Sequence, residues 1–203
     1  MRIAYLADSS PTSTAQHRSA ALERLGHQVV RFDPWTALGR RRLSRLDYHT
    51  GYRLLQRDYQ SALQTWFDAQ QGAWDLVWVD SGEWFGQPTV SLLRQCTKAP
   101  VLLYQIDDCT GSRDRRRFAS LRRALPEYDL CVSVRETTVL EMRALGARRT
   151  LRVWRSYDEI AHATSEIEPS STLGSCIGFI GTLIPGEGRD QLLVQLLRQG
   201  IPV

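Results

Sequence analysis

Short apolar runs alternate with longer amphipathic stretches along most of the chain. The short runs have the length and composition of β-strands rather than of helices. Several, such as residues 99–106, are apolar at nearly every position, which is typical of parallel strands buried on both faces. Strands are therefore expected over seven stretches, namely residues 2–8, 28–33, 74–80, 101–106, 130–133, 150–153 and 176–181.

Helical periodicity fills the intervals between these strands. It predicts a helix from about Ala15 to Leu25, a long helix over about residues 48–70, and a further helix over residues 114–125. Strands and helices that alternate in this way imply right-handed crossovers between parallel strands. The predicted class is α/β with a doubly wound parallel sheet.

The polar stretch 164–175 is rich in Ser and Thr and contains a Pro, so it is expected to be a linker between residues 1–163 and 176–203.

A length of 203 residues with 42% hydrophobic residues is ample for a buried core. No apolar run is long enough to cross a bilayer, so no transmembrane segment is expected. Four widely spaced cysteines without a CxxC pair favour a reducing, cytoplasmic location over a disulfide framework.

The formal charge of +4, from 26 basic and 22 acidic residues, is weak evidence for an anionic polymer as partner. Two arginine runs stand out, at residues 40–42 and 115–117. The second falls on the polar face of the predicted helix 114–125, so we expect it to face solvent. No RNP-type or helix-turn-helix pattern accompanies either run, and no nucleic-acid partner is expected.

Candidate chemistry lies after the strands, because parallel sheets bind ligands at the carboxyl ends of their strands. The first such loop, residues 8–14, is rich in hydroxyl groups and leads into a helix, which suits an anionic or sugar ligand. An ordinary N-cap cluster explains the same residues equally well. His17 and Arg18 follow on the first helical turn, where they face either the cleft or solvent.

Carboxylates follow two later strands. Glu83 lies beside Trp84 and Phe85, a combination common in sugar sites and equally common where a loop packs on a helix. Asp107 and Asp108 end a buried strand; two close carboxylates raise each other's pKa, which suits a general base. Alternatively, one of them caps the next turn while the other is solvated. The pair is not a DxD motif, and no metal site is predicted.

Several segments together resemble one family. Residues 17–32 (HRSAALERLGHQVVRF) are similar to the entry helix and second strand of GT-B glycosyltransferases. The Asp107–Asp108 pair, residues 128–131 (YDLC) and residues 144–147 (ALGA) resemble the CgeB-like, spore-maturation branch of the group 1 glycosyltransferases. Three later segments resemble the first strand and helix of the second domain in that branch. They are residues 177–182, 189–193 and 200–203.

The resemblance implies two Rossmann-like domains facing a cleft, with an acceptor-side domain over residues 1–163 and the start of a truncated donor domain over residues 176–203. It implies transfer of a sugar from a nucleotide-sugar donor to an unknown acceptor, without metal or another cofactor, and an isolated chain that is inactive. Asp107 or Asp108 would be catalytic, and Gly181 and Thr182 would lie by the donor diphosphate. The acceptor would be bound by Ser9, Ser10, Thr12, His17, Arg18 and Glu83.

Two other classes stay open. One is a non-catalytic α/β binding or scaffold module, which is favoured by Cys109 at a position where the branch usually has Pro. The other is a phosphorylation-type regulatory domain with Mg²⁺ at the acidic pair. In addition, the apolar residues of segment 176–203 are expected to pack on the N-terminal domain or to pair with a second chain in a homodimer.

Overall fold

A six-stranded, all-parallel sheet forms the centre of the first of two units, Met1–His162 and Ala163–Val203. The computed structural model describes residues 1–11, 13–39, 45–163, 177–181, 183, 186 and 188–203. The strand order is β2-β1-β3-β4-β5-β6, an open Rossmann-like arrangement, and the predicted α/β class is confirmed. The strands are β1 (Arg2–Leu6), β2 (Gln28–Phe32), β3 (Leu76–Asp80), β4 (Val101–Gln105), β5 (Leu130–Ser133) and β6 (Thr150–Arg152).

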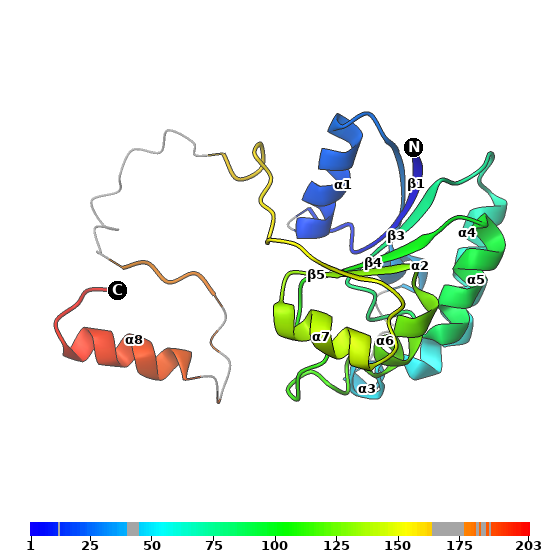
Figure 1. The fold of residues 1–203 in the computed structure, drawn as a ribbon. Helices are drawn as coiled ribbons and strands as arrows, with labels where there is room; N and C mark the ends of the chain where they lie inside the picture. Colours follow the sequence, from blue (N-terminus) through cyan, green and yellow to red (C-terminus); the bar gives the residue numbers. More distant parts are fainter. Residues whose placement is uncertain (12, 40–44, 164–176, 182, 184–185, 187) are drawn as a thin grey trace. The chain divides into compact units, whose positions relative to one another are not determined.

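Helices cover both faces of the sheet, as Figure 1 shows. Residues of α1 pack with one face, whereas those of α4, α5, α6 and α7 pack with the other. No described helix combines the length and the apolar character needed to cross a lipid bilayer. The helices of this unit are α1 (Thr14–Arg24), α2 (Pro34–Ala37), α3 (Arg45–Thr50), η1 (Arg53–Leu55), α4 (Gln56–Asp68), α5 (Gln87–Thr97), α6 (Ala119–Ala124), η2 (Leu125–Glu127) and α7 (Glu136–Ala144).

Alternation along the strands divides the core into two clusters. Ala4 and Leu6 of β1 belong to the large cluster that includes the side chains of α4 to α7, while Tyr5 joins the smaller cluster with Ala15 of α1. Both faces of β1 are therefore buried, which is why its sequence is apolar at successive positions. Burial of each large apolar side chain contributes roughly 1.5–3 kcal/mol.

The long helix expected over residues 48–70 is divided into α3, η1 and α4. Gly51 and Tyr52 both have positive φ, 65° and 57°, so the helix cannot continue through them. A Cβ on Gly51 would lie 2.6 Å from the carbonyl oxygen of Arg116, so the turn is packed tightly against the chain that precedes α6. The break turns Tyr52 into the core, where it is 3% exposed.

The helix expected over residues 114–125 begins only at Ala119, and the preceding residues form turns. Arg117 therefore does not lie on a helical polar face. Its side chain is 25% exposed and contacts carboxylates, so the prediction that it faces solvent is wrong. Arg115 and Arg116 are exposed, and for them the prediction is confirmed.

The second unit contains α8 (Arg189–Arg198), in which no residue is buried; Leu192 and Leu197 are 58% and 56% exposed. The strand predicted over residues 176–181 is wrong for residues 177–181, which form no strand, while Cys176 lies outside the described residues. The predicted linker 164–175 and the arginine run 40–42 also lie outside them. Pairing of this segment between two chains stays a prediction.

Candidate functional site

A cavity of about 380 Å³ lies at the carboxyl edge of the sheet. The chain leaves β1 for α1 on one face and leaves the neighbouring β3 for α5 on the other, so the strand order reverses here. Open α/β sheets bind ligands at such a switch point. The lining residues follow β1, β2, β3 and β4; they are Asp8, Ser13, Thr14, Ala15, Arg18, Trp35, Asp80, Ser81, Glu83, Trp84, Ile106 and Arg117.

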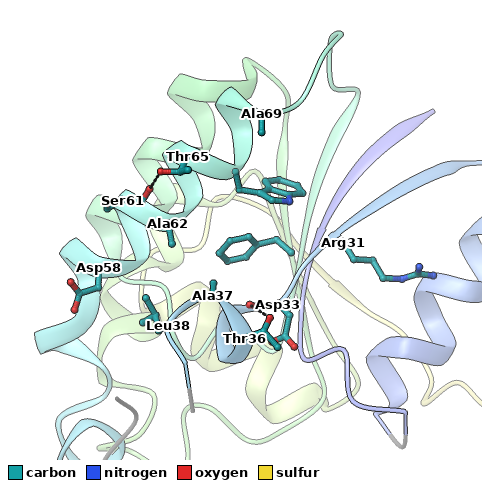
Figure 2. Close-up of a pocket in the computed structure, with 12 residues that line it drawn as sticks. Arg31, Asp33, Thr36, Ala37, Leu38, Asp58, Ser61, Ala62, Thr65 and Ala69 are labelled. Atoms are coloured by element: carbon teal, nitrogen blue, oxygen red, sulfur yellow. Dashed lines mark hydrogen bonds between the residues drawn. The ribbon is translucent and has the colours of Figure 1, made fainter. Parts of the chain in front are cut away.

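A larger groove, of about 720 Å³, lies between α2 and α4 beside the edge strand β2 (Figure 2). Its hydroxyl groups bond within their own elements: Thr65 donates to the Ser61 carbonyl and Thr36 to the Asp33 carbonyl. Figure 2 shows Arg31 extending away from the groove, where it bonds to residues of α1. Because no set of ionisable groups converges there, we take the smaller cavity at the switch point as the candidate site.

Arg18 and Asp80 form a two-point ion pair on one side of the cavity. The Arg18 Nε donates to Asp80 Oδ2 at 2.7 Å, and Nη2 donates to Oδ1 at 2.9 Å. The Asp80 side chain is 1% exposed and also accepts the Tyr5 hydroxyl at 2.6 Å. The guanidinium lies 4.7 Å from the centre of the Tyr104 ring. The pair therefore joins the N-terminal half of α1 to the end of β3 in a fixed geometry.

Arg18 and Tyr5 both hold their protons strongly beside Asp80. Burial alone would lower the pKa of Arg18, but the hydrogen bonds and charge of Asp80 raise it above its ordinary value. Burial and the neighbouring Asp80 carboxylate also raise the pKa of Tyr5, which therefore stays a protonated donor. Arg18 and Tyr5 therefore keep their protons near neutral pH, and their contacts with Asp80 hold α1 and β1 to the end of β3.

Glu83 and Asp107 converge on Arg117 at the other side of the cavity. Arg117 Nη2 contacts Glu83 Oε2, and Nη1 lies 3.8 Å from Asp107 Oδ2. The Glu83 side chain is 4% exposed, while that of Asp107 is 45% exposed. Tyr52 donates a long hydrogen bond of 3.4 Å to Glu83 Oε1. The Glu83 Oε2 atom is itself buried, and it contacts the Arg117 guanidinium.

Burial raises the pKa of Glu83 from 4.5 to about 7, although Arg117 opposes the shift. Asp107 adds to the rise by like-charge repulsion. A carboxyl group with a pKa near neutrality exists in both protonation states under ordinary conditions. It can therefore accept and return a proton efficiently, which is the property of a general acid or base.

A strained turn after β3 brings Glu83 to the cavity. Ser81 has φ 67°, a left-handed conformation that non-glycine residues rarely adopt. Gly82 follows with φ 60°, and a Cβ there would lie 2.7 Å from Leu103 Cδ1. Strain of this kind concentrates at functional sites because the surrounding structure must hold it in place.

Two tryptophans complete the wall of the cavity. Trp35 and Trp84 meet edge to face with ring centres 6.0 Å apart, and the buried indole N–H of Trp84 has no hydrogen-bond partner among the described residues. Each arginine of the lining contacts a carboxylate, so the cavity has little net positive charge. Aromatic faces beside carboxylates suit a neutral, hydroxyl-rich ligand better than a phosphate.

The structure separates the predicted acceptor-binding residues. Arg18 and Glu83 line the cavity, whereas the Ser9 hydroxyl donates to Asp33 at 2.6 Å. Ser10 bonds to Asp8 through its N–H and hydroxyl groups. Thr12 lies outside the described residues.

His17 lies outside the main cavity, in a smaller one of about 70 Å³ that also contains Arg18. Its ring meets that of His162 edge to face, with centres 5.0 Å apart. Of the two predicted donor-binding residues, Gly181 belongs to the second unit, and Thr182 lies outside the described residues.

Asp107 and Asp108 differ in their surroundings. Asp108 Oδ1 accepts the backbone N–H groups of Thr110 and Gly111, at 3.3 and 2.8 Å, so it stabilises the turn after β4. Burial alone would raise the pKa of Asp108, but these hydrogen bonds hold it below its ordinary value. Asp108 thus has the geometry of a capping residue, and Asp107 is the member of the pair that lies near Glu83.

Sequence reasoning missed Trp35, Tyr52 and Arg117 as parts of the site; it included Asp80 in a candidate loop but gave it no role. Asp80 carried a usable signal, because it ends a predicted strand at the same edge as the helical turn that bears Arg18. Trp35 also follows a predicted strand, 28–33, whereas Tyr52 and Arg117 had no such signal, because their positions depend on the longer segments after β2 and β4. Comparison with known proteins adds no family: no family model matches the chain, and no curated protein matches its sequence.

Proposed function

We propose that residues 1–163 form the acceptor-side domain of a GT-B glycosyltransferase, in which Glu83 is the general base toward an acceptor hydroxyl. The observation that carries the proposal is the buried Glu83 carboxyl group, with its pKa of about 7, in a cavity at the switch point of the sheet. The resemblance of residues 17–32 to the entry helix of GT-B enzymes supports the same class.

In the proposed reaction, Glu83 takes the proton of the acceptor hydroxyl group. The acceptor oxygen then forms a bond to the anomeric carbon of a nucleotide-sugar, and the bond from that carbon to the nucleotide diphosphate breaks. Glu83 suits this role because it lines the cavity and its carboxyl group has a pKa of about 7. Trp35, which is partly exposed, would bind the apolar face of a sugar-like acceptor, while Trp84 is 3% exposed and packs against Trp35.

This proposal transfers the role of base from Asp107 or Asp108 to Glu83. Asp108 is engaged by the turn after β4, and Asp107 is half exposed, so neither has a comparable environment. Asp107 instead supports Glu83, because its charge helps to raise the pKa of that carboxyl group.

Tryptophan fluorescence tests the acceptor site directly. We expect a panel of oligosaccharides and other polyols to include a ligand that changes the emission of the chain, and Trp35→Ala to abolish that change. Trp154→Ala is the matched control, because Trp154 lies outside the cavity and is 78% exposed.

The dependence of binding on Glu83 separates an enzyme from a binding module. Glu83→Gln should retain acceptor binding but remove its pH dependence around pH 7. Because the resemblance implies that the isolated chain is inactive, the catalytic test needs a form that also carries the donor domain. In that form, release of nucleotide from a panel of nucleotide-sugars should fall by about 10²–10⁴-fold in Glu83→Gln. Acceptor binding without any nucleotide release by that form would favour the non-catalytic binding module, and no response to either panel would contradict the proposal.

The proposal includes a reducing, cytoplasmic location and a homodimer. The free thiols of Cys96, Cys109 and Cys131 support the first. Exposure of Leu192 and Leu197 on α8 supports the second, because burying them against a second chain would stabilise the assembly.

A further inference from the structure

Four large apolar side chains are exposed within a short segment at the end of the first unit. Leu151 is 49% exposed, Trp154 and Tyr157 are each 78% exposed, and Ile160 is 64% exposed. Single exposed apolar residues are ordinary on protein surfaces. Four in such close succession, two of them aromatic, mark a segment that contacts something else.

The same segment carries a concentration of unpaired positive charge. Four of its arginines are exposed, and none of them forms an ion pair in the part of the chain that the structure describes. One of them lies over the Trp154 ring, with its guanidinium carbon 4.2 Å from the ring centre. The four arginines are Arg148, Arg149, Arg152 and Arg155.

The acidic residues of the segment do not neutralise these arginines. Asp158 and Glu159 both contact Arg24 of α1, at 2.7 and 2.9 Å. Asp158 also accepts the backbone N–H groups of Ile160 and Ala161, at 3.0 and 2.8 Å. These contacts attach Asp158 and Glu159 to α1, so the backbone that carries the exposed side chains is fixed at this end.

We propose that residues 148–160, the basic aromatic segment, bind the surface of a membrane that contains anionic lipids. Arginines pair with lipid phosphates, and tryptophan and tyrosine favour the boundary between headgroups and acyl chains. Leu151 and Ile160 distinguish a membrane from a nucleic acid, because exposed aliphatic side chains have no partner on a phosphate backbone. A second copy of the chain is a poor occupant, since it would place four arginines against four others.

Vesicle sedimentation with the full chain tests this proposal. We expect binding to phosphatidylcholine vesicles that contain about one third phosphatidylglycerol, weak binding to phosphatidylcholine alone, and a loss of binding as salt is raised. Arg152→Gln/Arg155→Gln should weaken the binding by about 30-fold, at roughly fivefold for each arginine. The matched control is Arg115→Gln/Arg116→Gln, which removes the same charge from two other exposed positions and should leave binding unchanged.

A second variant tests the apolar contribution. Trp154→Ala/Tyr157→Ala keeps every arginine and should still lose at least about tenfold in vesicle affinity, because membrane insertion depends on the aromatic rings. Equal binding by both double variants and the wild type would overturn the proposal. So would preferential binding of single-stranded nucleic acid, or protection of residues 148–160 from hydrogen exchange in the free chain, which would show that protein already covers them.

Discussion

Arg117 contacts Glu83 inside the cavity at the switch point, and the same guanidinium lies 3.8 Å from Asp107. One arginine thus lies between a carboxylate that follows β3 and another that follows β4. The arrangement keeps Glu83 near the balance between its two protonation states, because burial raises its pKa while Arg117 lowers it.

Replacing Arg117 should disturb that balance in a defined direction. In Arg117→Leu, the main group that lowers the pKa of Glu83 is gone, so the carboxyl group should remain protonated above pH 7. Because a neutral carboxyl group is cheaper to bury than a charged one, the loss of stability should be only about 1–2 kcal/mol. Urea denaturation at pH 7 measures this cost. Arg116→Leu, at an exposed position, should change stability by less than about 0.5 kcal/mol, and a lower Glu83 pKa in Arg117→Leu would contradict the account.

The stability of the protein should decrease as pH rises through the titration of Glu83. The folded state holds this proton more tightly than the unfolded chain, with a pKa of about 7 against 4.5. The resulting stabilisation is complete below pH 4.5 and disappears as the pH rises through 7, a change on the order of 3 kcal/mol. Glu83→Gln mimics the protonated form and should lack this dependence. The difference between the two unfolding free energies, measured from pH 4.5 to 8, isolates Glu83; a constant difference would refute the assignment.

Breaking the Arg18–Asp80 ion pair should cost far more stability than breaking an exposed ion pair. Asp80→Ala leaves a guanidinium that is 13% exposed without its partner, which should cost about 3–5 kcal/mol. Removing both charges in Arg18→Met/Asp80→Ala should recover part of that loss. Glu159→Gln is the comparison, since Glu159 is 65% exposed and its pair with Arg24 should contribute less than about 1 kcal/mol. Equal losses from the two single variants would argue against a buried ion pair.

Gly82 should be more sensitive to substitution than Gly26, although both have positive φ. Nothing lies within 4 Å of a Cβ at Gly26, so Gly26→Ala should cost only the conformational strain, about 1–2 kcal/mol. Gly82→Ala adds a contact of 2.7 Å with Leu103 and should cost about 1–3 kcal/mol more. Thermal unfolding of the two variants compares these costs. Similar melting temperatures would mean that the turn before Glu83 tolerates a side chain.

The central strands were predictable because they are apolar at successive positions and buried on both faces. The run 99–106 predicts a strand buried on both faces, and β4 occupies Val101–Gln105. Helix boundaries were less predictable, because tertiary contacts override periodicity. The turn at Gly51 fits against the carbonyl of Arg116, a contact between segments that no local pattern reveals.

The candidate site was only partly predictable for the same reason. Glu83 was placed in the acceptor site from its position after a predicted strand, and it lines the cavity. Its partner Arg117 was assigned to solvent because the helical pattern was extended over a segment that forms turns. The pKa of Glu83 depends on burial and on that partner, so the choice of Glu83 over Asp107 required the fold.

The titration of Glu83 is the most direct test of the central claim. The side-chain carboxyl ¹³C resonance of Glu83, assigned by its absence in Glu83→Gln, can be followed by NMR between about pH 3 and 9. The account predicts a midpoint at a pKa of about 7. A midpoint near 4.5, the ordinary value for this group, would contradict the role of Glu83 as an acid or base poised at neutral pH.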